Sequence, residues 1–86
     1  MQTQTLLKRI SITPTVLHGK PRVKGTRIAV SMVLELLAEG ISPQEIRSRF
    51  YLDLSLADIF ACIAFAEQFM ENEEIHFFEE LKHSLH

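Results

Sequence analysis

The chain has 86 residues, of which 47% are hydrophobic and 23% charged, with a formal net charge of −2 and one cysteine. A chain of this size forms one domain with a modest core, and its composition excludes wholesale disorder. The single Cys62 excludes an internal disulfide and a cysteine-based zinc site, and the longest apolar run, residues 59–66, is too short to cross a bilayer. The N-terminus has no charged start followed by an apolar stretch, so we expect no secretory signal, no membrane partner and a cytoplasmic protein.

Charge is divided unevenly along the chain. Residues 1–49 hold eight basic residues against three acidic ones, a net charge of +5, whereas residues 50–86 hold eight acidic residues against one lysine, a net charge of −7. Such asymmetry indicates two different contact surfaces, a basic one suited to phosphates and an acidic one suited to a basic protein.

Residues 1–30 are predicted to form a β-hairpin arm. Short β-favouring stretches at 10–12, 15–17, 21–24 and 27–30 alternate with turn signals, two of which are His18-Gly19 and Lys24-Gly25. Because a lone hairpin is only marginally stable, this arm requires a helix or a second subunit to pack against.

Residues 31–70 are predicted to form a bundle of three helices. The first begins at a cap residue, Ser31, and ends at Gly40. Capping boxes at Ser42–Glu45 and Ser55–Asp58 open the second and the third helix, and the third is expected to run to about Met70. Short connections between three helices are typical of a helix-turn-helix-like arrangement.

Residues 71–86 are predicted to form an amphipathic, acidic helix. Its apolar positions fall in one sector of a helical wheel, and they are Phe77, Phe78, Leu81 and Leu85. Asn72, followed by Glu73 and Glu74, has the character of a helix start, but the third helix can equally run on unbroken.

The third helix is a poor candidate for reading bases. It begins with Asp58 among apolar residues, and it has no lysine or arginine before residue 71. Residues 59–66 are apolar all round, which is typical of a helix buried on every side. We therefore predict a homodimer that buries Ile59, Phe60, Ile63 and the arm strands in an isologous interface.

A better candidate nucleic-acid surface is the basic half. Arg22 and Lys24 are two apart, so on a strand they share one face while Val23 points to the other. The full set of candidate phosphate ligands is Lys20, Arg22, Lys24, Arg27, Arg47 and Arg49. These residues would bind the backbone without reading sequence; the alternative is a solvated basic face.

Neither a metal site nor a catalytic site is expected. His76, Glu80 and His83 share one helix face, but zinc sites usually take ligands from more than one element. No nucleophile elbow, phosphate-binding loop or zinc-protease motif is present, so we predict no cofactor and no enzymatic activity.

Several spaced blocks of the sequence resemble a known family. They are the string GKPRVKGTRIAV at residues 19–30, LELLAEG at 34–40, SPQEI at 42–46 and LSLADI at 54–59. Together they are similar to the prokaryotic family named domain of unknown function 433, over about residues 9–70.

The resemblance implies a homodimer with an N-terminal β arm on a homeodomain-like three-helix bundle. Many members of the family look like VapB-type antitoxins encoded beside a PIN-like ribonuclease toxin. We therefore expect an antitoxin of a type II toxin-antitoxin system that also binds its own operator DNA. The acidic charge and the apolar stripe of the predicted C-terminal helix make it the expected toxin-binding segment, through Glu73, Glu74, Phe77, Phe78, Leu81 and Leu85. The alternative for this segment is that it packs on its own bundle or on the second subunit of the dimer. The alternative is a stand-alone DNA-binding transcriptional regulator.

Overall fold

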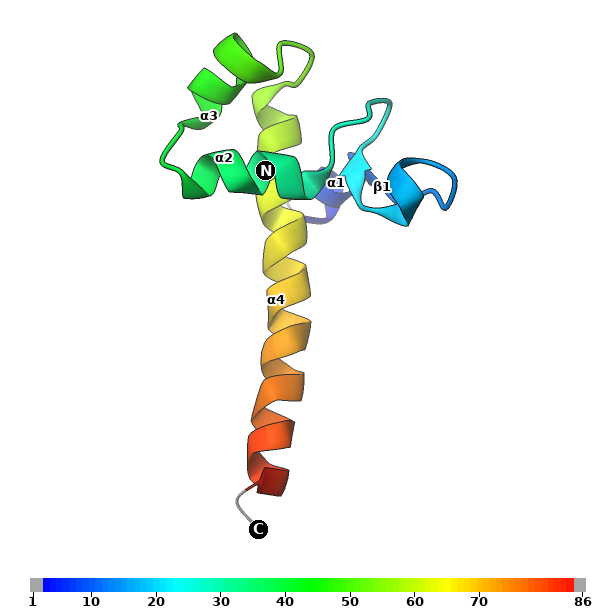
Figure 1. The fold of residues 1–86 in the computed structure, drawn as a ribbon, viewed down its shortest axis with the longest axis vertical. Helices are drawn as coiled ribbons and strands as arrows, with labels where there is room; N and C mark the ends of the chain where they lie inside the picture. The colour runs from blue at the N-terminus through cyan, green and yellow to red at the C-terminus, as the bar shows by residue number, and fades with distance from the viewer. Residues whose placement is uncertain (1–2, 85–86) are drawn as a thin grey trace.

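The computed structural model describes the backbone of residues 3–84 and the side chains of residues 3–71. In it a small helical body, with a two-stranded sheet at one side, surrounds the first half of a long helix (Figure 1). The second half of that helix projects away from the body, so the molecule measures 52 Å along its longest axis against 31 and 24 Å across. The prediction of a mainly α protein with a small β element is confirmed.

The N-terminal arm contains less strand than the sequence predicts. Strand β1 (Ile10–Ser11) pairs antiparallel with β2 (Arg22–Val23), so that Ile10 lies opposite Val23. Residues 27–30 contribute a single bridge, at Ala29, and residues 15–17 form no strand. There the chain instead makes the short 3-10 turn η1 (Leu17–Gly19), in which all three residues have positive φ. Leu17 and His18, the two residues before the glycine, have left-handed backbone conformations. They reverse the direction of the chain sharply, which is incompatible with an extended strand.

A short helix lies at the start of the segment predicted to form the arm, where the sequence predicted no helix. Helix α1 (Thr3–Leu7) buries Leu6 against Ala61 and Ala64 of the long helix. Two alanines on that helix leave room for α1 to approach closely. The contact depends on residues more than fifty positions away, so no local pattern marks it.

The first predicted helix of the bundle is α2 (Val30–Ala38), and it begins two residues earlier than a helix capped by Ser31 would. Its N-cap is Ala29, which has no side-chain acceptor, so Ser31 lies inside the helix and is not the cap. The predicted end is confirmed: Gly40 has a φ of +90°. The amides of Gly40 and Ile41 donate to the carbonyls of Leu37 and Leu36, which closes the helix in a Schellman motif.

The next helix is short and changes from an α-helical to a π-helical turn. Helix α3 (Pro43–Glu45) is capped as predicted, since the Ser42 hydroxyl accepts a hydrogen bond from the Glu45 amide at 3.2 Å. It continues as a π-helical turn, η2 (Ile46–Phe50), which ends where the Tyr51 amide donates to the Ile46 carbonyl. The wider turn places Ile46 in the core.

Helix α4 (Leu56–Ser84) begins with both halves of the predicted capping box. The Asp58 amide donates to the Ser55 hydroxyl at 3.1 Å, and the Ser55 amide donates to the Asp58 carboxylate at 2.9 Å. The helix then runs without interruption, which is the second of the two alternatives stated for the C-terminal segment: no break separates residues 71–84 from the third helix.

The core of the body joins the arm to α2, η2 and α4. Its fully buried side chains come from β2, α2, η2, the loop before α4 and α4 itself, and they are Val23, Val33, Ile46, Leu54, Ile59 and Cys62. Phe65 is the last described residue along the chain that packs against this cluster. The described core therefore ends well before α4 does.

Candidate functional site

The basic residues of the arm do not share one strand face. Strand β2 ends at Val23, and Lys24 follows it in the turn around Gly25. The expectation that Arg22 and Lys24 lie side by side on a strand is therefore wrong. Lys20, Lys24 and Arg27 are exposed and lie in the turns on either side of the strand.

Arg22 differs from the other basic residues because its guanidinium is used inside the arm. Its Nη1 donates to the Thr26 carbonyl at 3.0 Å, and its Nη2 donates to the Thr13 hydroxyl at 3.3 Å. The Nε atom is buried without a hydrogen-bond partner. Arg22 thus ties the loop before η1 to the turn after β2, a role that sequence reasoning missed.

Arg47 and Arg49 lie on η2, and both are exposed. The Arg47 Nε donates to the Leu54 carbonyl at 2.9 Å, so this side chain also joins η2 to the loop before α4. The Arg49 guanidinium lies 3.4 Å from the Glu45 carboxylate, an exposed pair of little energetic weight. Five of the six predicted phosphate ligands are therefore exposed, and Arg22 is not among them.

The carboxylate at the N-terminus of α4 already has a hydrogen bond and an ion pair within the chain. Asp58 closes the capping box and also lies 3.2 Å from the Arg9 guanidinium. A carboxylate at a helix N-terminus repels a phosphate, which favours the interpretation that this helix does not enter a DNA groove.

The three predicted interface residues lie on two different sides of α4. Ile59 is completely buried in the core of its own chain and has no surface left for a partner. Phe60 and Ile63 are 39% and 40% exposed on the other side of the helix. The expectation that α4 is buried on every side is therefore wrong for the single chain.

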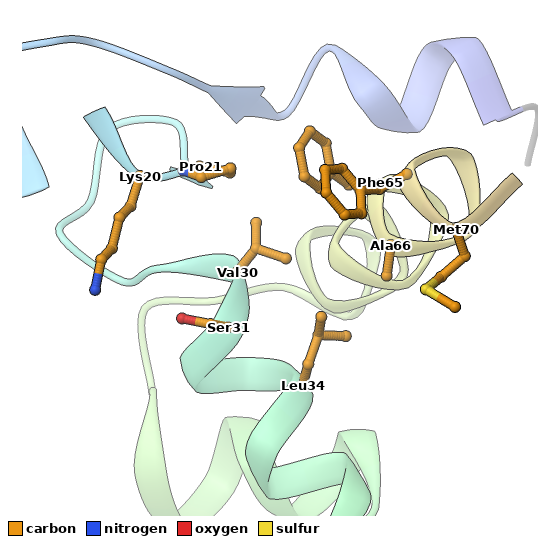
Figure 2. Close-up of a pocket in the computed structure, with 9 residues that line it drawn as sticks. Lys20, Pro21, Val30, Ser31, Leu34, Phe65, Ala66 and Met70 are labelled. Carbon is orange, nitrogen blue, oxygen red and sulfur yellow. The ribbon is translucent and has the colours of Figure 1, made fainter. Parts of the chain in front are cut away.

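An apolar groove of about 490 Å³ lies between α4 and the start of α2 (Figure 2). Its apolar lining includes Pro21, Val30, Leu34, Phe65, Phe69 and Met70. Lys20 lines one edge, on the opposite side of the groove from Phe65 and Met70. Sequence reasoning missed this groove, although the helical spacing of Phe65, Phe69 and Met70 was a usable signal.

The predicted toxin-binding residues lie outside the described side chains. Glu73, Glu74, Phe77, Phe78 and Leu81 belong to the projecting part of α4, of which only the backbone is described, and Leu85 lies beyond the described backbone. The candidate metal ligands His76, Glu80 and His83 fall in the same part. Among the described residues, no group of three or more histidine, cysteine, aspartate or glutamate side chains is placed so that it could bind a metal ion.

Cys62 is a completely buried residue of the core. Burial, with a smaller contribution from the charge of Asp58, raises the pKa of the Cys62 thiol to about 12. A thiol that stays protonated at neutral pH is a poor nucleophile and a poor metal ligand. The described part of the chain contains no helix with the length and apolar character that a membrane span requires.

Comparison with known proteins places this fold in a family. No curated protein and no solved structure matches the chain. The family described as "Protein of unknown function (DUF433)" matches residues 10–66, a stretch that begins at β1 and ends just after Phe65. Because this match covers well over half of the 86 residues, the chain belongs to the DUF433 family.

Proposed function

We propose that the chain is a VapB-type antitoxin that binds and inhibits a PIN-like ribonuclease toxin through the projecting part of α4. The observation that carries the proposal is the division of α4 into two parts. Up to Phe65 the helix packs in the body, whereas residues 71–84 extend beyond it as continuous helix (Figure 1). The family match also ends at residue 66. A helix that continues past its own core provides a surface for another molecule.

The composition of this segment suits a ribonuclease. A ribonuclease must hold a polyanion, so its RNA-binding groove is expected to be basic. From Glu67 to Glu80 the chain has six carboxylates and no lysine or arginine. These charges would speed encounter and set orientation, and the apolar residues Phe77, Phe78, Leu81 and Leu85 would supply most of the affinity. A helix laid into a groove is a recurrent mode of recognition.

A truncation that ends at Asn72 tests the proposal. We expect this variant to keep the helical circular dichroism and cooperative unfolding of the body, because the described core ends at Phe65. We also expect it to lose the ability to restore growth when co-expressed with the ribonuclease encoded beside it. A truncated chain that folds and still neutralises would contradict the mechanism, and one that unfolds would assign the segment to the core.

A second candidate function, DNA binding, is favoured by the exposed basic residues and by the homeodomain-like bundle that the family resemblance implies. Lys20, Lys24 and Arg27 of the arm are all exposed. Contacts of this kind bind phosphates, so affinity for DNA should be weak and should fall steeply with salt.

Replacing Lys20, Lys24 and Arg27 with alanine should reduce the salt slope of DNA binding by about one unit per lost contact. Arg22 is left intact in this variant because it holds the arm together. An unchanged salt slope would show that the arm does not contact DNA. If the wild type does not retard DNA in a gel at low salt, DNA binding is contradicted altogether.

A further inference from the structure

A polar hollow of about 290 Å³ lies beside the π-helical turn η2, and its lining residues are Gln44, Arg47, Ser48 and Leu52. Gln44, Arg47 and Ser48 have the spacing that places side chains on one side of a helix, so three hydrogen-bond donors line one small space. Turns of π-helix are rare and occur frequently at functional sites. In the molecule, α3 and η2 lie at the end opposite the projecting part of α4 (Figure 1). The hollow is therefore separate from the segment proposed to bind a ribonuclease.

Arg47 is fixed to the body in a way that leaves donors for a ligand. Its Nε donates to the carbonyl of buried Leu54 at 2.9 Å, which holds the guanidinium in place. Neither terminal nitrogen of Arg47 has a hydrogen bond or a carboxylate partner among the described residues. Two N–H donors in one fixed plane match a pair of phosphate oxygens, and a donor that is already held in place loses little entropy on binding.

The other arginines of residues 3–71 are placed differently. Arg9 and Arg49 each lie within 3.4 Å of a carboxylate. Arg22 uses both terminal nitrogens inside the arm, and Arg27 is exposed in one of its turns. The hollow is thus distinguished by the geometry of Arg47 and not by positive charge alone.

We propose that this hollow binds a phosphate group, with the terminal nitrogens of Arg47 donating to two of its oxygens and the side chains of Gln44 and Ser48 donating to the others. The Ser48 hydroxyl makes only a long contact, 3.4 Å, to the Glu45 carbonyl, so it can turn to a ligand. A phosphate presents its oxygens in three dimensions and a carboxylate in one plane, so donors from three side chains suit a phosphate better.

The phosphate can come from the backbone of DNA or from a small phosphorylated molecule. The first source rests on the DNA-binding candidate above and extends it to a second surface besides the arm. The second source is independent of that candidate. The two experiments below distinguish these sources.

The first experiment tests the site itself. Sodium phosphate replaces sodium chloride at constant ionic strength, and the backbone amide shifts of the full chain are followed by NMR. We expect saturable shifts at residues 44–48, and we expect Arg47→Lys to raise the phosphate Kd by at least about 10-fold, because lysine keeps the charge but not the pair of donors. Arg49→Lys is the matched control on the same turn, outside the hollow, and should leave the Kd unchanged. Shifts that do not saturate, or equal effects of the two substitutions, overturn the proposal.

Two further variants decide the question if Arg47→Lys fails to fold. Gln44 and Ser48 are exposed, so Gln44→Ala and Ser48→Ala should both keep the fold. Each should weaken phosphate binding about fivefold, through the loss of one hydrogen bond. Gln68→Ala, at an exposed position on α4, is the control and should bind as the wild type does. If Gln44→Ala and Ser48→Ala also bind as the wild type does, the hollow is not the site.

The second experiment identifies the source of the phosphate. It measures the salt dependence with which the chain retards a short DNA duplex in a gel. If the source is DNA, Arg47→Gln should lower the salt slope by about one unit and Arg49→Gln should not. An unchanged slope in Arg47→Gln, with phosphate binding intact in the wild type, assigns the hollow to a small phosphorylated molecule. An absence of retardation by the wild type contradicts the DNA-binding candidate alone, because the phosphate titration decides the hollow.

Discussion

Arg22 and Asp58 both use their charge within the fold. Arg22 donates to Thr26 and Thr13, and Asp58 accepts from the Ser55 amide beside Arg9. The contact between Asp58 and Ser55 is local, and the sequence predicted it as a capping box. The contacts of Arg22 depend on loops that only the folded chain brings together, so from the sequence Arg22 counted among the charges available to a partner. The exposed lysines of the arm, by contrast, lie where a basic composition predicts them.

Replacing Arg22 with methionine should therefore destabilise the protein. The change removes two hydrogen bonds from a charged donor while keeping an aliphatic stem, so we expect a loss of about 2 kcal/mol in the free energy of unfolding. Denaturant unfolding measures it. Lys24→Met is the control on the neighbouring turn, and it should change stability by less than about 0.5 kcal/mol because Lys24 is exposed. Equal effects of the two substitutions would contradict the role given to Arg22.

Cys62 should make stability depend on pH only in alkaline solution. Its pKa is raised from 9.0 to about 12 in the folded chain, so above pH 9 the unfolded thiol ionises while the folded thiol does not. Its contribution is fully present below pH 9 and falls between pH 9 and 12, by about 1.4 kcal/mol per pH unit at most. The stability difference between the wild type and Cys62→Ala should shrink over this range. A difference that stays constant from pH 9 to 12 would show that the thiol titrates normally.

At the scale of elements, boundaries set by local hydrogen bonds were predicted well. Gly40 ends α2, Ser42 caps α3 and Ser55 opens α4, because each signal requires only residues close in sequence. Elements that depend on distant contacts were predicted poorly. The π-helical turn η2 places Ile46 in a core built from the whole body, and α1 forms against alanines of α4. The groove was missed for the same reason, since its walls come from three separate segments.

The capping residue of α4 and the residue that the sequence predicted to cap α2 give a direct test of these boundaries. Ser55→Ala removes the hydroxyl that accepts the Asp58 amide, so we expect it to cost about 1 kcal/mol in the free energy of unfolding. Ser31→Ala should change stability by less than about 0.5 kcal/mol, because Ser31 lies inside α2 and the cap is Ala29. If Ser31→Ala costs as much as Ser55→Ala, the start of α2 has been placed incorrectly.

At the scale of the whole molecule, the chain joins a DUF433 body to a helix that continues beyond it. The charge follows the same division, with a net +5 in residues 1–49 and −7 in residues 50–86. In the account proposed above, the projecting part of α4 carries the surface for a ribonuclease.

The most direct measurement is hydrogen exchange of the full chain with and without the PIN-like ribonuclease proposed above as its partner. Binding removes amides from solvent exchange where the partner covers the helix or stabilises it. The account predicts that adding the ribonuclease slows exchange in residues 71–84 and leaves the amides of β1 and β2 unchanged. Slower exchange confined to the arm, or no change in residues 71–84 when the two proteins form a complex, would contradict it.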